Sequence, residues 1–280
     1  MSNANGKPDL VELKIDGETV RAPIGATIME AARDAGIAIP SICWDSRIEP
    51  IGSCRLCLVE IQGEEGLVTA CQTKVREGIW VAANNADLDA YRRTEIEWYA
   101  KHASAEDLAA HPDKDLHRLM ARYAVGPAGC PSPAAAIDTS MPQIRVDMTK
   151  CIDCLRCVQI CEEVQGASVW HEVGRGDNSR IVPKHGELLS EGGCVACGAC
   201  TDTCPTAALT DAGAAPAQIW TRTTCPYCGV GCELDIGVTN GRIVAAKPAP
   251  DAPVNRGHAC SKGRYAFGFT HSPERQAQPL

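Results

Sequence analysis

The chain has few large apolar side chains and no long apolar run. Aromatic residues make up 4% of its 280 residues, and only two of them are Phe. Small domains with so little aromatic content bury little apolar surface, and they usually need disulfides or metal to fold. No stretch of about 18 apolar residues is present, so we expect no membrane span. Residues 1–10 are polar and lack the apolar segment of a secretory signal, and no twin-arginine signal opens the chain.

These absences decide how the abundant cysteines are interpreted. The chain has 17 cysteines, which in a secreted protein would indicate disulfides. Because no secretory signal is present, we expect a cytoplasmic protein, in which Cys-x2-Cys runs indicate metal or redox sites. The net charge of −8 argues against a nucleic-acid surface and suits docking to other protein subunits.

Sixteen of the cysteines fall into four sets of four. The sets are Cys43-x10-Cys54-x2-Cys57-x13-Cys71, Cys151-x2-Cys154-x2-Cys157-x3-Cys161, Cys194-x2-Cys197-x2-Cys200-x3-Cys204 and Cys225-x2-Cys228-x3-Cys232-x27-Cys260. Four thiolates hold one iron–sulfur cluster, so the sequence predicts four clusters. Cys130 remains outside the sets, and we interpret it as an unligated thiol.

The two central sets have the spacing of bacterial two-cluster ferredoxins. In that spacing the fourth cysteine of each run ligates the other cluster. The sequence therefore predicts one 4Fe–4S centre on Cys151, Cys154, Cys157 and Cys204, and a second on Cys194, Cys197, Cys200 and Cys161. Zinc knuckles are the alternative, because Cys-x2-Cys also suits tetrahedral zinc. Zinc sites do not normally repeat this three-plus-one spacing twice, so we favour iron–sulfur.

The pattern of apolar residues and turns predicts an α+β chain of four parts. Residues 1–85 open with a hairpin turned at Asp16-Gly17, followed by a helix that begins with the capping box Thr27-x-x-Glu30. Residues 86–143 are predicted to be helical and to end in a linker from Gly126 to Pro142. Residues 144–212 form the two-cluster ferredoxin unit. Residues 217–280 form a small β-rich unit with a hairpin at Asn240-Gly241.

The first part resembles the β-grasp 2Fe–2S domain at the N-terminus of three related kinds of protein. These are the large iron–sulfur subunit of respiratory complex I, iron-only hydrogenases and NAD-linked formate dehydrogenases. The segments Ser41-Ile-Cys-Trp44 and Gly52-Ser-Cys-Arg-Leu-Cys57 carry the resemblance, which implies a 2Fe–2S cluster on Cys43, Cys54, Cys57 and Cys71. A zinc site or disulfides are the alternative.

In this family a cluster held by one His and three Cys usually follows, and the sequence departs from that pattern. If His102 is aligned with the family histidine, Glu106, Ala109 and Asp115 occupy the thiolate positions. His111 has no suitable cysteines after it either. We therefore expect that this cluster is lost while its helical region remains, and that His102 and His111 are surface residues.

The last part resembles the cluster-binding start of molybdenum or tungsten bis-pterin enzymes, above all formate dehydrogenases. The resemblance lies in Thr224-Cys-Pro-Tyr-Cys-Gly-Val-Gly-Cys232 and in Gly257-His-Ala-Cys-Ser-Lys-Gly263. It implies a 4Fe–4S cluster on Cys225, Cys228, Cys232 and Cys260. It also implies that Lys262 lies between this cluster and the pterin cofactor. The alternative is that Lys262 is a solvated lysine on a turn.

Together the resemblances suggest the iron–sulfur region of the alpha subunit of an NAD-linked molybdenum or tungsten formate dehydrogenase. This implies one 2Fe–2S and three 4Fe–4S clusters, no catalytic residue within the chain, and a pterin site in a downstream or partner portion. The implied partners are that catalytic pterin domain and a flavin- and NAD-binding iron–sulfur subunit. Two alternatives stay open: a subunit of a complex I-like or hydrogenase assembly, and a freestanding polyferredoxin that only carries electrons.

Overall fold

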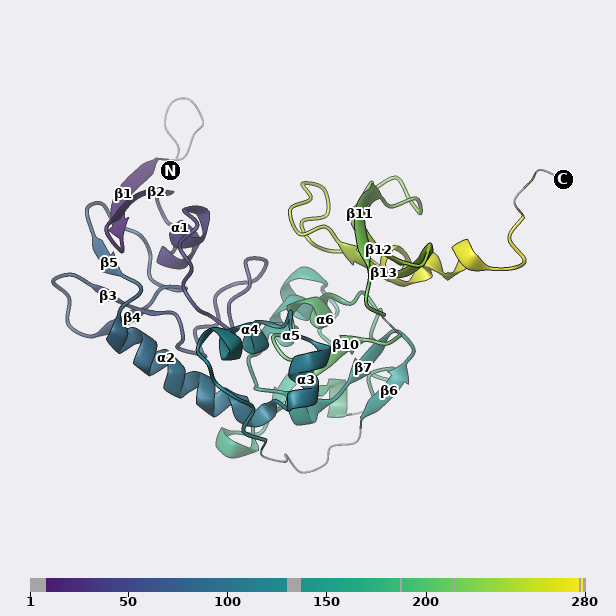
Figure 1. Cartoon of the computed structure of the whole chain (residues 1–280), viewed down its shortest axis with the longest axis horizontal. Helices are drawn as coiled ribbons and strands as arrows, with labels where there is room; N and C mark the ends of the chain where they lie inside the picture. The colour runs from purple at the N-terminus through teal and green to yellow at the C-terminus, as the bar shows by residue number, and fades with distance from the viewer. Residues whose placement is uncertain (1–8, 130–136, 187, 214, 277, 279–280) are drawn as a thin grey trace. The chain divides into compact units, whose positions relative to one another are not determined.

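The computed structural model describes residues 9–129, 137–186, 188–213, 215–276 and 278, and its path is shown in Figure 1. The chain divides into two compact units. The first comprises residues 1–134, 149–156 and 205–207, and the second comprises residues 135–148, 157–204 and 208–280. Within the described ranges, no helix combines the length and the apolar character needed to cross a membrane. Cys130 lies outside the described residues.

The first unit begins with a five-stranded mixed sheet. Its strands are β1 (Leu10–Ile15), β2 (Glu18–Pro23), β3 (Leu58–Ile61), β4 (Leu67–Thr69) and β5 (Trp80–Ala82). Their order in the sheet is β2-β1-β5-β3-β4, and only the β1–β5 pair is parallel. The predicted hairpin turn is confirmed, because Asp16 and Gly17 have φ angles of +50° and +86°, as a type I′ turn requires.

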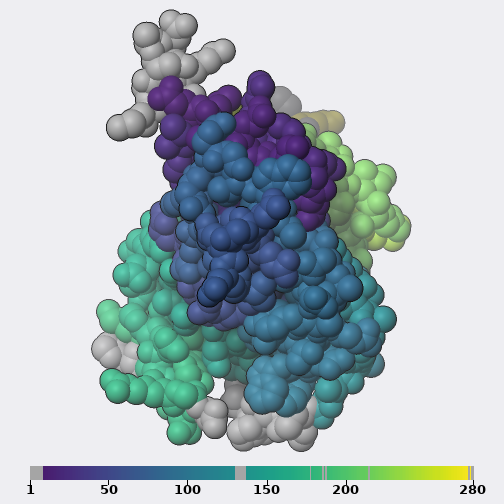
Figure 2. All heavy atoms as spheres, turned by 90° about the vertical axis from the view of Figure 1, so that its left-hand side faces the viewer, coloured from purple at the N-terminus to yellow at the C-terminus, as the bar shows by residue number. Residues whose placement is uncertain are grey.

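Helix α1 (Ile28–Asp34) packs its buried residues onto this sheet. The predicted capping box is confirmed: the Glu30 amide donates to the Thr27 hydroxyl at 3.2 Å, and the Thr27 amide donates to the Glu30 carboxylate at 2.6 Å. Ile28 and Ala32 are fully buried in one apolar cluster with Ile15 and Val59 of the sheet. Figure 2 shows residues of these segments, purple to blue, packed together on one face of the unit.

The predicted helical region is also confirmed. It contains α2 (Ala86–Tyr99), the turn η1 (Ala100–His102), α3 (Ala105–Ala110) and α4 (Asp115–Arg122). The side chains of Asn85 and Ser104 accept hydrogen bonds from amides in the first turns of α2 and α3, as good N-cap residues do. Ile96 of α2 and Leu116 of α4 are fully buried in a second apolar cluster.

The second unit contains a three-stranded and a two-stranded sheet around the central cysteines. Strands β6 (Asp138–Met141), β7 (Ile144–Val146) and β10 (Leu209–Asp211) pair antiparallel in the order β10-β7-β6, and β8 (Trp170–Val173) pairs with β9 (Arg180–Pro183). The linker was expected to run from Gly126 to Pro142, and its last part was wrong. Residues Asp138–Met141 form strand β6, and Pro142 lies in the turn between β6 and β7.

Short helical elements connect these strands. They are η2 (Met148–Lys150), α5 (Arg156–Gln159), the π-helical turn η3 (Ile160–Val164), η4 (Gly176–Asn178), η5 (Lys184–Gly186) and α6 (Ala199–Thr203). Cys161 lies in η3, and Cys200 lies in α6. The chain passes from one compact unit to the other within η2 and again within α5.

A separate three-stranded sheet follows in the second unit. Strands β11 (Ile219–Thr224), β12 (Glu233–Thr239) and β13 (Arg242–Pro248) form an antiparallel sheet in that order. The predicted hairpin joins β12 to β13, and Asn240 and Gly241 both have positive φ angles, of +51° and +73°. Helix α7 (Ser261–Tyr265) and the 3₁₀ helix η6 (Ala266–His271) complete the described part of this region.

Candidate iron–sulfur sites

The first cysteine set is buried, and its four thiols form two contacting pairs. The Cys54 amide lies 3.5 Å from the Cys43 sulfur. A hydrogen bond from the Cys54 thiol lowers the pKa of Cys43 to about 5, against the opposing effect of burial. The same hydrogen bond, together with burial, raises the pKa of Cys54.

Cys57 and Cys71 form the second pair. Cys57 directly precedes β3, and Cys71 follows the end of β4, so the sheet brings both to one place. A hydrogen bond from the Cys71 thiol lowers the pKa of Cys57 and raises that of Cys71. Two pairs of thiols, each able to bind one iron, fit a 2Fe–2S cluster held by four cysteines.

A buried arginine of α2 fixes the loop that carries Cys57. The Arg92 side chain is fully buried. Its guanidinium donates to the carbonyls of Leu56 and Leu58, each at 3.1 Å, and to the carbonyl of Ala83 at 2.7 Å. Leu56 and Leu58 flank Cys57, so one side chain holds the backbone on both sides of this cysteine. The sequence analysis did not identify Arg92, because a single arginine in a charged helix looks like a surface residue.

The helical region in which the family usually holds a His/Cys cluster is filled by apolar side chains. Cys43 and Cys54 belong to the apolar cluster that contains Ile96 and Leu116, and Cys154 packs against the same cluster. His102 and His111 are half-buried rather than exposed, so the expectation that they are surface residues was only partly correct. Burial lowers the pKa of His111.

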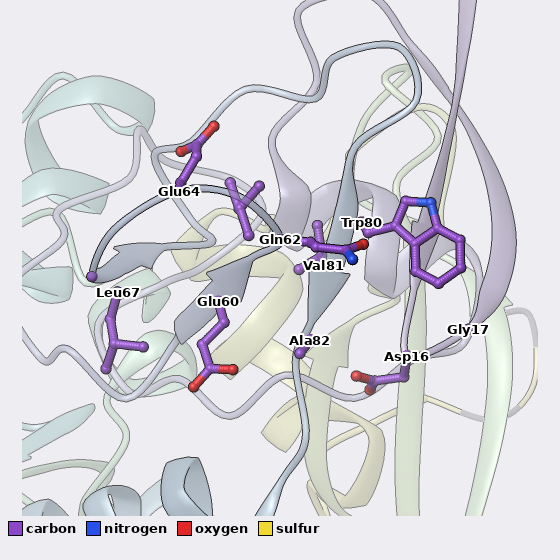
Figure 3. Close-up of a pocket in the computed structure, with 11 residues that line it drawn as sticks. Asp16, Gly17, Glu60, Gln62, Glu64, Leu67, Trp80, Val81 and Ala82 are labelled. Carbon is purple, nitrogen blue, oxygen red and sulfur yellow. The ribbon is translucent and has the colours of Figure 1, made fainter.

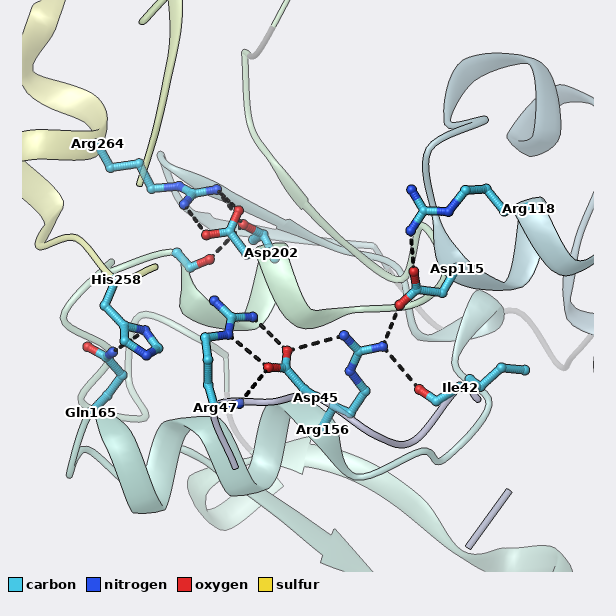
Figure 4. Close-up of polar contacts among 12 residues, drawn as sticks. Ile42, Asp45, Arg47, Asp115, Arg118, Arg156, Gln165, Asp202, His258 and Arg264 are labelled. Carbon is cyan, nitrogen blue, oxygen red and sulfur yellow. Dashed lines mark hydrogen bonds and ion pairs between the residues drawn. The ribbon is translucent and has the colours of Figure 1, made fainter. Parts of the chain in front are cut away.

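Asp115, which takes the position of a family thiolate, has a different role in this chain. Its carboxylate accepts a hydrogen bond from the buried guanidinium of Arg156 at 2.7 Å. Arg156 also donates to Asp45 at 3.2 Å and to the carbonyl of Ile42 at 3.0 Å, as Figure 4 shows. Arg156 lies between Cys154 and Cys157 in sequence, and Ile42 precedes Cys43. The ion pairs therefore tie the loop of the first set to the segment that follows Cys154.

Cys161 lies near the third cysteine run; that these four cysteines hold one cluster stays a prediction. The Cys161 thiol is among the neighbouring charges that raise the pKa values of Cys194, Cys197 and Cys200, although burial is the larger cause for each. The backbone amide of Val169 donates to the Cys161 sulfur at 3.3 Å, and the amide of Ala196 donates to the Cys194 sulfur at 3.4 Å. Amide donors to sulfur are one of the means by which a protein tunes a cluster's potential.

The grouping of the other four central cysteines stays a prediction. Cys151 and Cys154 belong to the first compact unit, whereas Cys157 and Cys204 belong to the second. Within their own units, Cys154 packs against the apolar cluster of the helical region, and Cys204 is buried at the C-cap of α6.

The last set lies between the β11–β13 sheet and α7. The Cys225 amide donates to the carbonyl of Cys232 at 2.7 Å, which closes the first turn of the loop. Burial raises the pKa of Cys232, with further contributions from Cys225, Cys228 and Cys260, so the four thiols share one neighbourhood. Cys228 and Cys260 are exposed, whereas Cys225 is buried.

Two small residues shape the backbone around this set, and one charged residue lies beside it. Gly231 has a φ angle of +74°, which favours glycine, and a Cβ on Gly263 would lie 3.5 Å from the Cys225 sulfur. Lys262 is exposed on α7, next to Gly263. Its proposed contact with a pterin stays a prediction.

The donor sets fit clusters by their chemistry. Soft thiolates in groups of four are the ligands that iron–sulfur clusters use. The first set is fully buried, and each central run has two buried cysteines, so these sites have the dry surroundings that tune potentials. Among the residues that the structure describes, no group of three or more His, Cys, Asp or Glu has the geometry of a site for a single metal ion. When bound, clusters of these types accept and release single electrons.

A separate hollow in the first unit contains none of the sixteen cysteines. It measures about 550 Å³ and is lined by residues of β3, β5 and the β1–β2 turn, as shown in Figure 3. The carboxylates at its edge already have partners: Asp16 accepts from the Asn84 side chain at 2.7 Å, and Glu60 accepts from Asn85 at 3.2 Å. We therefore assign it no ligand.

Comparison with known protein families identifies three regions of the chain. Residues 9–86 match the 2Fe-2S iron-sulfur cluster binding domain. Residues 141–210 match the ferredoxin-like domain of NADH-quinone oxidoreductase subunit 3. Residues 219–272 match the molybdopterin oxidoreductase Fe4S4 domain. The boundaries agree closely with the cysteine sets and with the sheets that hold them.

Several known proteins are similar to nearly the whole chain. It is 31% identical to the NADPH-Fe(3+) oxidoreductase subunit alpha of Geobacter sulfurreducens over 97% of its length, but spans 33% of that protein. It is 24% identical to a candidate formate dehydrogenase of Staphylococcus haemolyticus, over 95% of this chain and 32% of that protein. The chain thus spans about a third of the length of these relatives.

A solved structure is also similar. A chain of the NAD+-reducing [NiFe]-hydrogenase in its H2-reduced state has a TM-score of 0.60 and 26% sequence identity, covering 72% of this chain and 87% of that one. Three stretches of the chain therefore match iron–sulfur domains: a 2Fe–2S cluster binding domain, the ferredoxin-like domain of NADH-quinone oxidoreductase subunit 3, and the molybdopterin oxidoreductase Fe4S4 domain. Helices α2, α3 and α4 lie between the first two.

Proposed function

We propose that this chain is the electron-transfer part of an NAD-linked formate dehydrogenase, relaying electrons between a molybdenum or tungsten pterin site and a flavin subunit that reduces NAD. The observation that carries the proposal is the fourth cysteine set. It lies in a domain of the molybdopterin oxidoreductase family, and the same compact unit contains the Cys161, Cys194, Cys197 and Cys200 set. A cluster domain of this family joined to ferredoxin cysteines is suited to carry electrons away from a pterin.

The chain's own residues bind and insulate the redox centres. Sixteen cysteines supply the ligands, and the four cysteines of the 2Fe–2S set are at most 3% exposed. The pterin and the formate-oxidising metal would belong to a further portion of the enzyme or to a partner. Lys262 is the residue of this chain that we assign to the side of the pterin.

A second candidate has specific support. The 31% identity to an NADPH-Fe(3+) oxidoreductase subunit and the likeness to an NAD+-reducing hydrogenase favour an iron–sulfur subunit of an NAD(P)-linked complex with another electron donor. Both candidates use the same cysteine ligands. They differ in the compound that delivers or receives the electrons at the ends.

Two measurements test these proposals. Anaerobically reconstituted chain should contain about 14 iron atoms, from one 2Fe–2S and three 4Fe–4S clusters; stoichiometric zinc, or a fifth cluster with about 18 irons, would contradict the assignment. For the electron donor, the intact complex is mixed in turn with formate, NADPH and H2, and cluster reduction is followed by absorbance. Reduction by formate supports the first proposal, and reduction by H2 or NADPH alone would replace it with the second.

A further inference from the structure

A buried arginine joins the last cysteine set to the third one within the second compact unit. Arg264 lies on α7, four residues after Cys260, and its side chain is only 1% exposed. Its guanidinium donates to both oxygens of Asp202, at 2.5 and 2.7 Å, and to both oxygens of Asp211, at 2.7 and 3.3 Å. Figure 4 shows the contact between Arg264 and Asp202. Asp202 belongs to α6, the helix that carries Cys200.

The backbone of α6 is shaped to receive this arginine. Gly198, between Cys197 and Cys200, has a φ angle of +76°. A Cβ at this position would lie 2.3 Å from Nε of Arg264 and 2.6 Å from the hydroxyl of Tyr265. Any other residue at Gly198 would collide with both side chains. The ligand loop and α7 are therefore in direct contact, and glycine is required at the point where they meet.

Further hydrogen bonds complete the same contact. The Tyr265 hydroxyl donates to Asp211 at 2.7 Å, and the Thr201 hydroxyl also donates to Asp211 at 2.7 Å. On the other side of Cys260, the side-chain amide nitrogen of Gln165 lies 3.5 Å from Nδ1 of His258. Gln165 directly follows η3, the turn that contains Cys161. The segment around Cys260 is thus attached to both elements that supply ligands to the third set.

The other face of α7 contacts the last set itself. Gly263, the residue before Arg264, lies beside the sulfur of Cys225, where a Cβ would be 3.5 Å away. One short helix therefore touches a ligand of one cluster site and the ligand loop of the other.

We propose that Arg264 is the positioning residue of an electron-transfer junction between the Cys225, Cys228, Cys232 and Cys260 set and the Cys161, Cys194, Cys197 and Cys200 set. The inference rests on the proposed function. It adds that, of the two ferredoxin sites, the one that contains Cys194 exchanges electrons with the Cys225 site. One electron crosses the junction at a time, lost on one side and gained on the other, and the protein forms or breaks no bond. Without Arg264, the carboxylates of Asp202 and Asp211 would lie uncompensated beside the third set, so Arg264 favours the reduced state on that side.

The test compares Arg264→Met with Arg264→Lys in the full reconstituted chain, using dithionite as the reductant so that no formate activity is needed. Arg222→Met is the matched control. Arg222 lies in the same domain and also pairs with two aspartates, Asp235 and Asp251, but its side chain is 43% exposed. Iron content and the EPR spectrum of the fully reduced protein are recorded for each variant, together with a redox titration of each cluster.

We expect Arg264→Met to keep all its iron, to lose the magnetic splitting between two reduced 4Fe–4S clusters, and to shift one cluster to a lower potential. Arg264→Lys should restore the potential more fully than the splitting, because it returns the charge without the planar fork that fixes the geometry. The control should resemble the wild type. A Met variant with full iron and unchanged splitting and potential would overturn the proposal.

If Arg264→Met loses iron, Gly198→Ala provides the second variant, since it displaces the arginine without removing any charge. Loss of the magnetic splitting in Gly198→Ala with full iron supports the junction, and an unchanged splitting refutes it. Failure of formate to reduce the complex would contradict the proposed function alone, because none of these measurements uses formate.

Discussion

Replacement of Arg92 by Met should destabilise the 2Fe–2S domain more than any surface substitution in the same helix. The change leaves three buried carbonyls, those of Leu56, Leu58 and Ala83, without their charged donor. An unsatisfied buried acceptor costs about 1–3 kcal/mol. Breaking a buried charged contact typically costs about 3–5 kcal/mol in total. We therefore expect a loss of about 3–5 kcal/mol, a large share of the roughly 5–15 kcal/mol that stabilises a domain.

The assay is the rate at which the 2Fe–2S EPR signal disappears in urea, because cluster release makes unfolding irreversible. A loss of about 3 kcal/mol raises the unfolding rate about 100-fold if the contacts of Arg92 break before the transition state. Arg93→Met is the control: Arg93 is the next residue of α2, but its side chain is 51% exposed. Its ion pair with Glu97 and its hydrogen bonds to the carbonyls of Tyr123 and Ala124 are at the surface, where water can replace them. We expect this control to change the rate less than about fivefold.

A rate for Arg92→Met within fivefold of the wild type would refute the reasoning, since it would mean that water or local rearrangement satisfies the three carbonyls. Arg92→Lys separates charge from geometry. Lysine keeps the positive charge but cannot reach three carbonyls with a planar fork. Its rate should lie between those of the wild type and the Met variant, and a rate equal to that of the Met variant would assign the whole effect to geometry.

Three further predictions concern the other sites. Cys204→Ser should damage the cube predicted on Cys151, Cys154 and Cys157 and leave the Cys194 cube intact, which EPR of each cluster can check; damage to the Cys194 cube instead would contradict crossed ligation. Lys262→Ala in the complete complex should slow formate-driven cluster reduction, measured by stopped flow, with full iron content; an unchanged rate would make Lys262 an ordinary surface lysine. Burial raises the pKa of Tyr265, so the folded chain keeps this proton above pH 10 while the unfolded chain releases it. Wild-type stability should therefore fall above pH 10 by up to about 1.4 kcal/mol per pH unit relative to Tyr265→Phe, and parallel pH profiles in urea unfolding would contradict this.

Local signals in the sequence were sufficient for the parts of the fold that depend on neighbouring residues. The turns at Asp16-Gly17 and Asn240-Gly241 and the capping box at Thr27 all follow from a few adjacent side chains. The spacing of the third cysteine run also predicted that Cys161 belongs with it, because a cluster would fix the spacing of its ligands; their shared ligation of a cluster stays a prediction. Strand β11 was missed, since all six of its residues are exposed and its sequence lacks alternation. Its β-branched and aromatic residues were the available signal.

The buried arginines could not be predicted in the same way. A guanidinium reaches a buried position only when distant segments supply its acceptors, and the sequence does not show which segments those are. Two partners of Arg156, Ile42 and Asp45, lie more than 100 residues away, and the third, Asp115, lies 41 residues away. The partners of Arg264, Asp202 and Asp211, lie more than 50 residues away. The π-helical turn around Cys161 depends in the same way on its surroundings rather than on its own sequence.

The three buried arginines share one arrangement that has a consequence for redox behaviour. Each comes from a helix and holds a loop that carries cluster ligands: Arg92 beside Cys57, Arg156 beside Cys43, and Arg264 beside Cys197. Two aspartates neutralise Arg156 and two neutralise Arg264. Arg92 instead bonds mainly to carbonyls, and its one ion-pair partner, Asp89, is 51% exposed and lies 3.5 Å away. The positive charge beside the 2Fe–2S ligands is therefore the least compensated of the three. A nearby cation stabilises the more negative, reduced state of a cluster. Arg92 should therefore raise the reduction potential of the 2Fe–2S cluster through its charge, in addition to holding the loop that carries Cys57.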